Sequence, residues 1–243
     1  MSQDTRRVLS CAAASGVVAV IVPGVDPESS REAVLLAREH PGAVFAAAGV
    51  HPQMEYDGSD DTGLSEIGQI ARSGAVAAIG EIGLDREEGP PMDIQERRFA
   101  AQLELAQGLA LPVLVHCRGA FAMLLAIIRA TGFSRGGIVH SWSGSLQSFE
   151  LLADIGFYAG VSGVAARPAA VRVRSVVTQI NLDRLVLETD APYIGTGRTP
   201  KGSTDPSSVA EVCGAVAELK GVSLEDVARI TTANARAALG LAR

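Results

Sequence analysis

The stretch Val76-Ala77-Ala78-Ile79-Gly80-Glu81 is a short apolar run that ends on a carboxylate, and the same pattern recurs along the chain. Continuous apolar runs of about four to seven residues, rich in β-branched side chains, are typical of parallel strands buried on both faces. The sequence predicts strands of this kind over residues 17–22, 44–49, 76–82, 112–116, 137–141, 157–161 and 185–189.

Amphipathic segments with helix-start signals lie between these runs. Helices are predicted to begin at Pro27-Glu28-Ser29-Ser30, at Asp93-Ile94-Gln95-Glu96 and at the capping sequence Ser223-Leu224-Glu225-Asp226. Regular strand–helix alternation predicts βαβ units and a parallel sheet. The 243 residues contain no long linker, so we expect one α/β domain over residues 1–243, a length that suits an α/β barrel.

Composition restricts the class of protein and its location. A net charge of −6 with 47% hydrophobic residues excludes a disordered chain and a basic protein that coats nucleic acid. Cys11, Cys117 and Cys213 are few and far apart, which indicates a reducing compartment and three small buried hydrophobic side chains. No apolar run reaches the roughly 18 residues of a membrane span, so we expect a cytoplasmic protein with no membrane partner.

Three of the four histidines and two carboxylates stand where a predicted strand ends: His51, Glu81, His116, His140 and Asp190. In an α/β barrel the carboxyl ends of all strands open on one face, where active sites are built. Neutral imidazole together with carboxylate suits Zn²⁺, Mn²⁺, Mg²⁺ and similar cations, and without thiolates in the set a structural zinc finger is disfavoured. The sequence therefore predicts a metal site at the mouth of the barrel.

The motifs around these residues resemble the TatD family of metal-dependent deoxyribonucleases. The resemblance covers nearly the whole chain in the right order and rests on Gly49-Val50-His51-Pro52, Gly80-Glu81-Ile82-Gly83-Leu84-Asp85, Leu111-Pro112-Val113-Leu114-Val115-His116-Cys117-Arg118, His140-Ser141-Trp142-Ser143-Gly144, Glu188-Thr189-Asp190-Ala191-Pro192-Tyr193 and Thr231-Thr232-Ala233-Asn234-Ala235. It implies a TIM-barrel metallohydrolase that cleaves phosphodiester bonds at DNA ends and releases nucleotides.

Carried over by position, the resemblance makes Glu81, His116, His140 and Asp190 the ligands of one or two divalent ions. Glu81 would bridge where two ions bind. Glu81 and Asp190 are then the catalytic residues, because a carboxylate beside the nucleophilic water can orient it or take its proton.

The resemblance also implies how a DNA or nucleotide substrate is bound. His51 is expected near the substrate, and Arg118 and the Ser143-Gly144 turn are expected to face phosphate. Gln53 stands where the family commonly has a second histidine, which suggests altered substrate contacts with the metal retained.

The family's first strand, which in many members carries His-x-His, has no counterpart in this chain, whose first helix is expected at Asp4-Thr5-Arg6-Arg7-Val8-Leu9. The expected fold is therefore a TIM-barrel-like sheet with seven of eight strands. A seven-stranded barrel has two unpaired edges. We expect the 17–22 and 185–189 strands to close on each other, or to leave a gap for a partner chain, self-association or a restored upstream segment.

Two other functions remain open at this point. A small-molecule amidohydrolase or esterase could use the same metal centre, because fold and ligands do not fix the substrate. A shortened barrel could also serve as a non-catalytic binding module.

Overall fold

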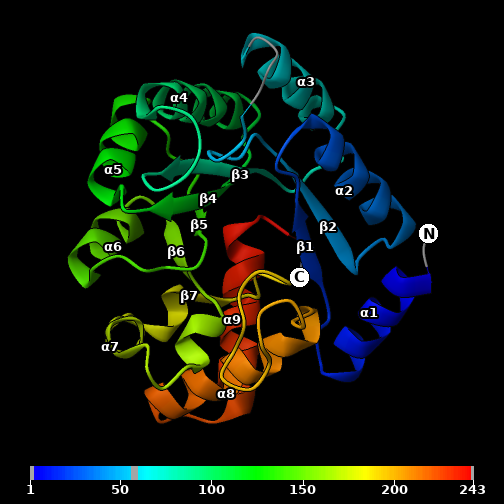
Figure 1. Cartoon of the computed structure of the whole chain (residues 1–243), viewed down its shortest axis with the longest axis vertical. Coiled ribbons are helices and arrows are strands. Elements are labelled where there is room, and N and C mark those ends of the chain that lie inside the picture. Colours follow the sequence, from blue (N-terminus) through cyan, green and yellow to red (C-terminus); the bar gives the residue numbers. More distant parts are fainter. Residues whose placement is uncertain (1–2, 56–59, 242–243) are drawn as a thin grey trace.

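Seven parallel strands in chain order form the sheet that the apolar runs predicted (Figure 1). The computed structural model describes residues 3–55 and 60–241. The strands are β1 (Val20–Pro23), β2 (Val44–Ala48), β3 (Ala78–Asp85), β4 (Val113–Arg118), β5 (Gly137–Val139), β6 (Phe157–Val161) and β7 (Leu185–Leu187). Their bounds differ from the predicted ones by up to three residues, as at β1, where Val18 is 64% exposed and the strand begins only at Val20.

The helices surround the curled sheet and cover its outer face (Figure 1). They are α1 (Gln3–Ala14), α2 (Pro27–Glu39), α3 (Asp60–Arg72), α4 (Met92–Gly108), α5 (Phe121–Ala130), α6 (Leu146–Ala153), α7 (Val171–Gln179), α8 (Val209–Lys220) and α9 (Leu224–Ala238), with short 3₁₀ turns η1 (Gly163–Ala166), η2 (Leu182–Arg184) and η3 (Pro206–Ser208). The predicted caps are present: the Asp26 side chain accepts from the Ser29 backbone N–H, and that of Ser223 accepts from Asp226. The main core lies between the sheet and these helices.

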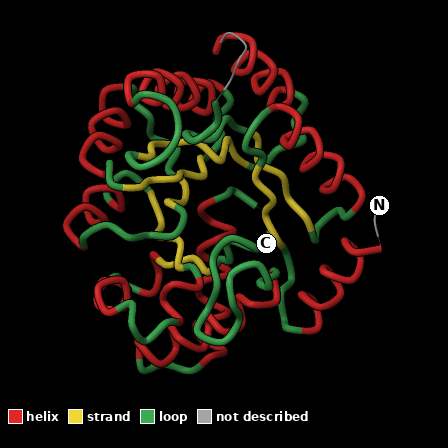
Figure 2. The backbone as a smooth tube through the Cα atoms, viewed as in Figure 1, coloured by secondary structure: helices red, strands yellow, loops and turns green. Residues whose placement is uncertain are grey.

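The interior of the curl holds the end of the last helix. Ala238 and Leu239 are buried with the inward-facing Ala47, Ala78 and Val186 in a second apolar cluster. Figure 2 shows this end of α9 surrounded by the strands. Small alanines on β2 and β3 leave room for the helix, so that a segment far along the chain completes the interior of the sheet.

The sheet does not close. The strand order ends at β1 and β7, and in the described part of the chain no strand pairs with the outer edge of either. Direct closure of these two strands, one of the expected outcomes, is therefore absent from this structure. Helix α1 instead packs against η3 across the opening.

The outer edge of β1 is a poor template for another strand. The backbone N–H groups of Val20 and Gly24 donate to Ala43 and Ala47, so the alternate residues Ile21 and Pro23 face the open side. Proline has no N–H to donate, and proline on an exposed strand edge limits pairing with other chains.

Cys117 and Cys213 are buried as predicted, but Cys11 is exposed, because α1 buries the face of Ala12 and turns the neighbouring residue to solvent. None of the described helices is long and apolar enough to cross a membrane.

Candidate metal centre

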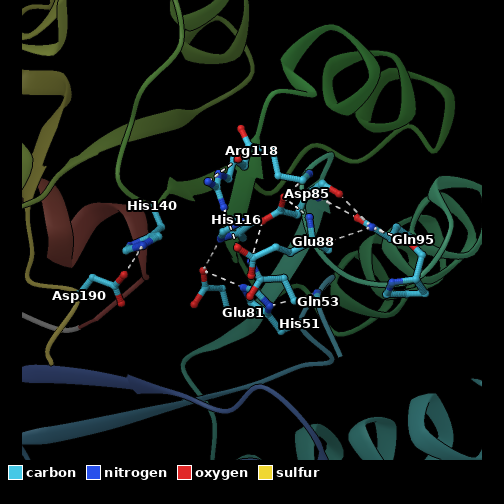
Figure 3. Close-up of polar contacts among 12 residues, drawn as sticks. His51, Gln53, Glu81, Asp85, Glu88, Gln95, His116, Arg118, His140 and Asp190 are labelled. Atoms are coloured by element: carbon cyan, nitrogen blue, oxygen red, sulfur yellow. Dashed lines mark hydrogen bonds and ion pairs between the residues drawn. The ribbon is translucent and has the colours of Figure 1, made fainter. Parts of the chain in front are cut away.

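The strand ends bring the predicted ligand residues to one face of the sheet. Glu81 lies in β3 and His116 in β4, His51 and His140 follow β2 and β5, and Asp190 follows β7. Figure 3 shows Glu81, His116 and His51 together on one side, with His140 and Asp190 facing each other beside them. Parallel strands produce this convergence because all of them end at the same edge.

Glu81 is the hub of the first group. Its Oε1 lies 3.4 Å from His116 Nδ1 and 3.6 Å from His51 Nε2. The two imidazole rings are 4.6 Å apart, edge to face. One ligand atom from each of the three residues falls within 4.8 Å of the others, a spacing that can hold a metal ion.

His140 forms the second group. Its Nδ1 lies 2.8 Å from Glu188 Oε1, and its Nε2 lies 3.8 Å from Asp190 Oδ2. The His140 ring stacks 6.5 Å from that of His116, which joins the two groups into one site.

The electrostatics of the site keep its carboxylate ionised. Burial alone would raise the pKa of Glu81, but the charge of His140 and the close contacts with His116 and His51 outweigh it and hold that pKa well below its usual range. Burial would lower the pKa of His140, but the charges of Glu188 and Glu81 raise it well above its usual range. The site therefore stabilises positive charge between its carboxylates.

The whole sequence fits one family. The model of the TatD related DNases matches residues 1–240. The chain belongs to this family.

Individual relatives are similar over almost their entire length. The 3'-5' ssDNA/RNA exonuclease TatD of Pectobacterium parmentieri is 32% identical over 99% of this chain and 95% of its own. The metal-dependent hydrolase YabD of Bacillus subtilis is 32% identical over 96% of this chain and 91% of its own. Among solved structures, YjjV, a TatD homologue from Escherichia coli, superposes with a TM-score of 0.91 at 32% identity over 98% of this chain and 93% of its own. The predicted fold and enzyme class, a TatD-family hydrolase acting on ester bonds, are confirmed.

The donor set of this TatD-family site fits a divalent cation. It offers imidazole nitrogens and carboxylate oxygens, the ligands that Zn²⁺ and Mn²⁺ share, and no thiolate. The low pKa of Glu81 supplies an ionised ligand at neutral pH.

Two carboxylates of the site were not assigned a role from the sequence. Asp85 lies 3.0 Å from His116 Nε2, and Glu188 accepts hydrogen bonds from the backbone N–H of Ser141 at 2.7 Å and from His140. Both stand in the quoted family motifs at the ends of β3 and β7. Their position could have identified them from the sequence, because Asp85 accompanies Glu81 at β3 and Glu188 accompanies Asp190 after β7.

The predicted phosphate-facing residues have other partners in this structure. Arg118 is 45% exposed and pairs with Glu87 and Glu88, at 3.2 Å from the latter. Ser143 is exposed, whereas Gly144 is buried against the Trp142 ring, where a Cβ would lie 2.5 Å from Cζ2. A glycine is therefore required at position 144.

Trp142 forms a wall beside this turn. Its indole is 3% exposed and lies between Phe121 and Phe149, with ring centroids at 4.7 and 5.5 Å. The ring is thus covered on the sides where a nucleobase would have to stack.

Proposed function

We propose that the protein is a metal-dependent exonuclease that hydrolyses phosphodiester bonds at the ends of single-stranded DNA or RNA. The observation that carries this proposal is the convergence of Glu81 with His116 and of His140 with Asp190 on one face of a TatD-family sheet. The curated relative from Pectobacterium parmentieri, similar over nearly its whole length, is such an exonuclease by name.

In this proposal Glu81, His116, His140 and Asp190 hold one or two divalent ions, of which Zn²⁺, Mg²⁺ and Mn²⁺ fit the oxygen and nitrogen donors. When bound, the cation supplies Lewis-acid activation of the phosphodiester and of the attacking water.

Asp190 acts on that water. Its side chain is 33% exposed, more than that of Glu81 at 14%, so that water and substrate can reach it. From this position Asp190 orients the water and takes its proton as the new P–O bond forms and the bond from phosphorus to the leaving sugar oxygen breaks, so that this oxygen takes up a proton and leaves as a hydroxyl group.

The remaining predicted residues bind the substrate. His51, 11% exposed beside Glu81, borders the reacting group. Arg118 exchanges its two glutamate partners for a phosphate, and the exposed Ser143 of the Ser143-Gly144 turn donates its hydroxyl group. A net charge of −6 disfavours a long contact with duplex DNA and suits a single strand end.

The proposal extends to domain organisation, location and assembly. The single sheet supports one hydrolase domain over residues 1–243. The free thiols of the three cysteines suit the reducing cytoplasm. Self-association across the open β1 edge is weak because Pro23 lacks a donor, and sedimentation at rising protein concentration measures it.

The test is a nuclease assay with single-stranded DNA labelled at either end, with Mg²⁺, Mn²⁺ or Zn²⁺ and with EDTA. We expect release of nucleotides from an end, abolished by EDTA and reduced about 100-fold or more in Asp190→Asn. Asp183→Asn is the matched control, because the exposed Asp183 precedes the same strand β7 at its other end.

Full activity of Asp190→Asn with its metal bound would remove Asp190 from the mechanism. A metal-loaded wild type that leaves every nucleic acid intact would refute the proposed substrate. Turnover of small esters or amides would then favour an amidohydrolase, and no turnover at all a binding module.

A further inference from the structure

Asp85 ends β3 with a side chain that is completely buried. Its Oδ1 accepts from the backbone N–H groups of Glu87 at 2.8 Å and Glu88 at 3.1 Å. Its Oδ2 accepts from Gln53 Nε2 at 2.7 Å and lies 3.0 Å from His116 Nε2 (Figure 3). An ionised carboxylate can only accept, so the His116 nitrogen that faces it carries the proton.

The position of that proton determines what His116 offers on its other side. A histidine that binds a metal is neutral and has one N–H, so as a ligand His116 keeps a free lone pair on Nδ1. It faces Glu81 Oε1 at 3.4 Å, and that oxygen also carries lone pairs. A cation between the two atoms would be coordinated by both lone pairs, and the arrangement therefore suits metal coordination through Nδ1.

His51 contrasts with His116 although it faces the same oxygen. Its Nδ1 accepts from the backbone N–H of Gln53 at 3.2 Å, so its proton is on Nε2, 3.6 Å from Glu81 Oε1. His51 thus directs an N–H toward Glu81, whereas His116 as a metal ligand directs a lone pair toward it. Gln53 contacts both systems, through its backbone for His51 and through its side chain for Asp85.

We propose that Gln53 and Asp85 are positioning residues that hold His116 in the Nε2–H tautomer and so present its Nδ1 to the metal. This inference rests on the metal centre of the proposed function. Histidine ligands commonly donate their second nitrogen to a carboxylate, and loss of that partner typically lowers metal affinity about 10- to 100-fold.

The geometry of Asp85 makes Asp85→Asn the decisive variant. The amide oxygen of the new side chain is required by the Glu87 and Glu88 N–H groups, which leaves its NH₂ group facing His116 Nε2 and Gln53, whose own amide can turn its oxygen toward the NH₂ group. That group can only donate, so His116 must move its proton to Nδ1, the atom needed for the metal. An Asp→Asn change beside a catalytic histidine that leaves the geometry intact but imposes the wrong tautomer is known from serine proteases.

The experiment reads the tautomer and the metal separately. The ¹⁵N NMR shifts of His116 are measured in metal-free protein across a pH series, so that the tautomer of the neutral imidazole is observed directly. Zn²⁺ and Mn²⁺ affinities are measured by calorimetry on wild type, Asp85→Asn, Gln53→Leu and the control Glu87→Gln. The control also removes one negative charge, two residues from Asp85, but the Glu87 side chain is 61% exposed.

We expect Nε2–H in the wild type and in Glu87→Gln, and Nδ1–H in Asp85→Asn with about 10- to 100-fold weaker metal binding. Gln53→Leu should retain the tautomer and weaken binding less, because Asp85 keeps three of its donors. The Gln53→Leu variant still tests the inference if Asp85→Asn fails to fold.

An Nδ1–H tautomer in the wild type, or wild-type metal affinity in a folded Asp85→Asn or in Gln53→Leu, would overturn the inference. Metal binding without nuclease activity would instead refute the proposed function and leave this inference standing.

Discussion

Leu239→Ala tests whether the end of α9 completes the interior of the open sheet. Leu239 is 4% exposed and packs in the cluster that contains Ala47 and Ala78 of the neighbouring strands. A buried Leu→Ala change costs about 2–5 kcal/mol, and more where the surrounding side chains cannot move into the cavity. Ala47, Ala78 and Ala238 of this cluster have no side-chain torsion that could fill the void, so we expect a loss of about 3–5 kcal/mol of unfolding free energy.

For a domain of this size each kcal/mol lowers the melting temperature by about 2–4 °C, which predicts a decrease of about 6–20 °C. Urea unfolding with an unchanged m-value and calorimetry measure both quantities. Leu224→Ala is the matched control, because Leu224 begins the same helix and is 55% exposed, and its cost should stay within about 0.5 kcal/mol. Equal effects of the two variants would show that α9 does not support the sheet.

Three further predictions concern the metal centre, the substrate and the thiols. Glu188→Ala removes the acceptor of His140 Nδ1 and should weaken metal binding about 10- to 100-fold by calorimetry, and an unchanged affinity would contradict this role. Arg118→Ala should raise the KM for single-stranded DNA and reduce the slope of log affinity against log salt by about 0.7, whereas an unchanged slope would exclude a phosphate contact. Burial raises the pKa of Cys117 to about 12, so its thiol stays protonated at pH 8. Maleimide should therefore label the exposed Cys11 first, as peptide mass spectrometry can show, and rapid labelling of Cys117 in native protein would contradict its burial.

The strand pattern could be predicted from the sequence because most of the strands are buried on both faces and read as continuous apolar runs. Helix α3 was not predicted. Its sequence contains Gly63 and Gly68, which lower helix propensity by about 1 kcal/mol each relative to alanine, and packing against α2 and α4 compensates for them. The position of α9 inside the sheet was also beyond prediction, because it depends on contacts between residues about 160 to 190 positions apart, such as Ala47 and Leu239.

The convergence of the site was predictable from strand direction, but its hydrogen bonds were not. Parallel strands fix which residues meet at one edge. The contacts of Asp85 depend instead on the loop that turns the Glu87 and Glu88 N–H groups back toward it, and on Gln53 from a different loop. Loop geometry of this kind has no periodic signal in the sequence.

The open edge of the sheet and the metal centre are structurally separable. Glu81 and His116 stand on β3 and β4 and His51 follows β2, all away from the edges, whereas Glu188 and Asp190 follow the edge strand β7. The loop after Asp190 is fixed from outside the sheet, because Glu211 of α8 accepts from the Thr196 hydroxyl at 2.5 Å. The unpaired edge of β7 therefore does not remove the support of Asp190, and the open sheet can hold the proposed ligands in place.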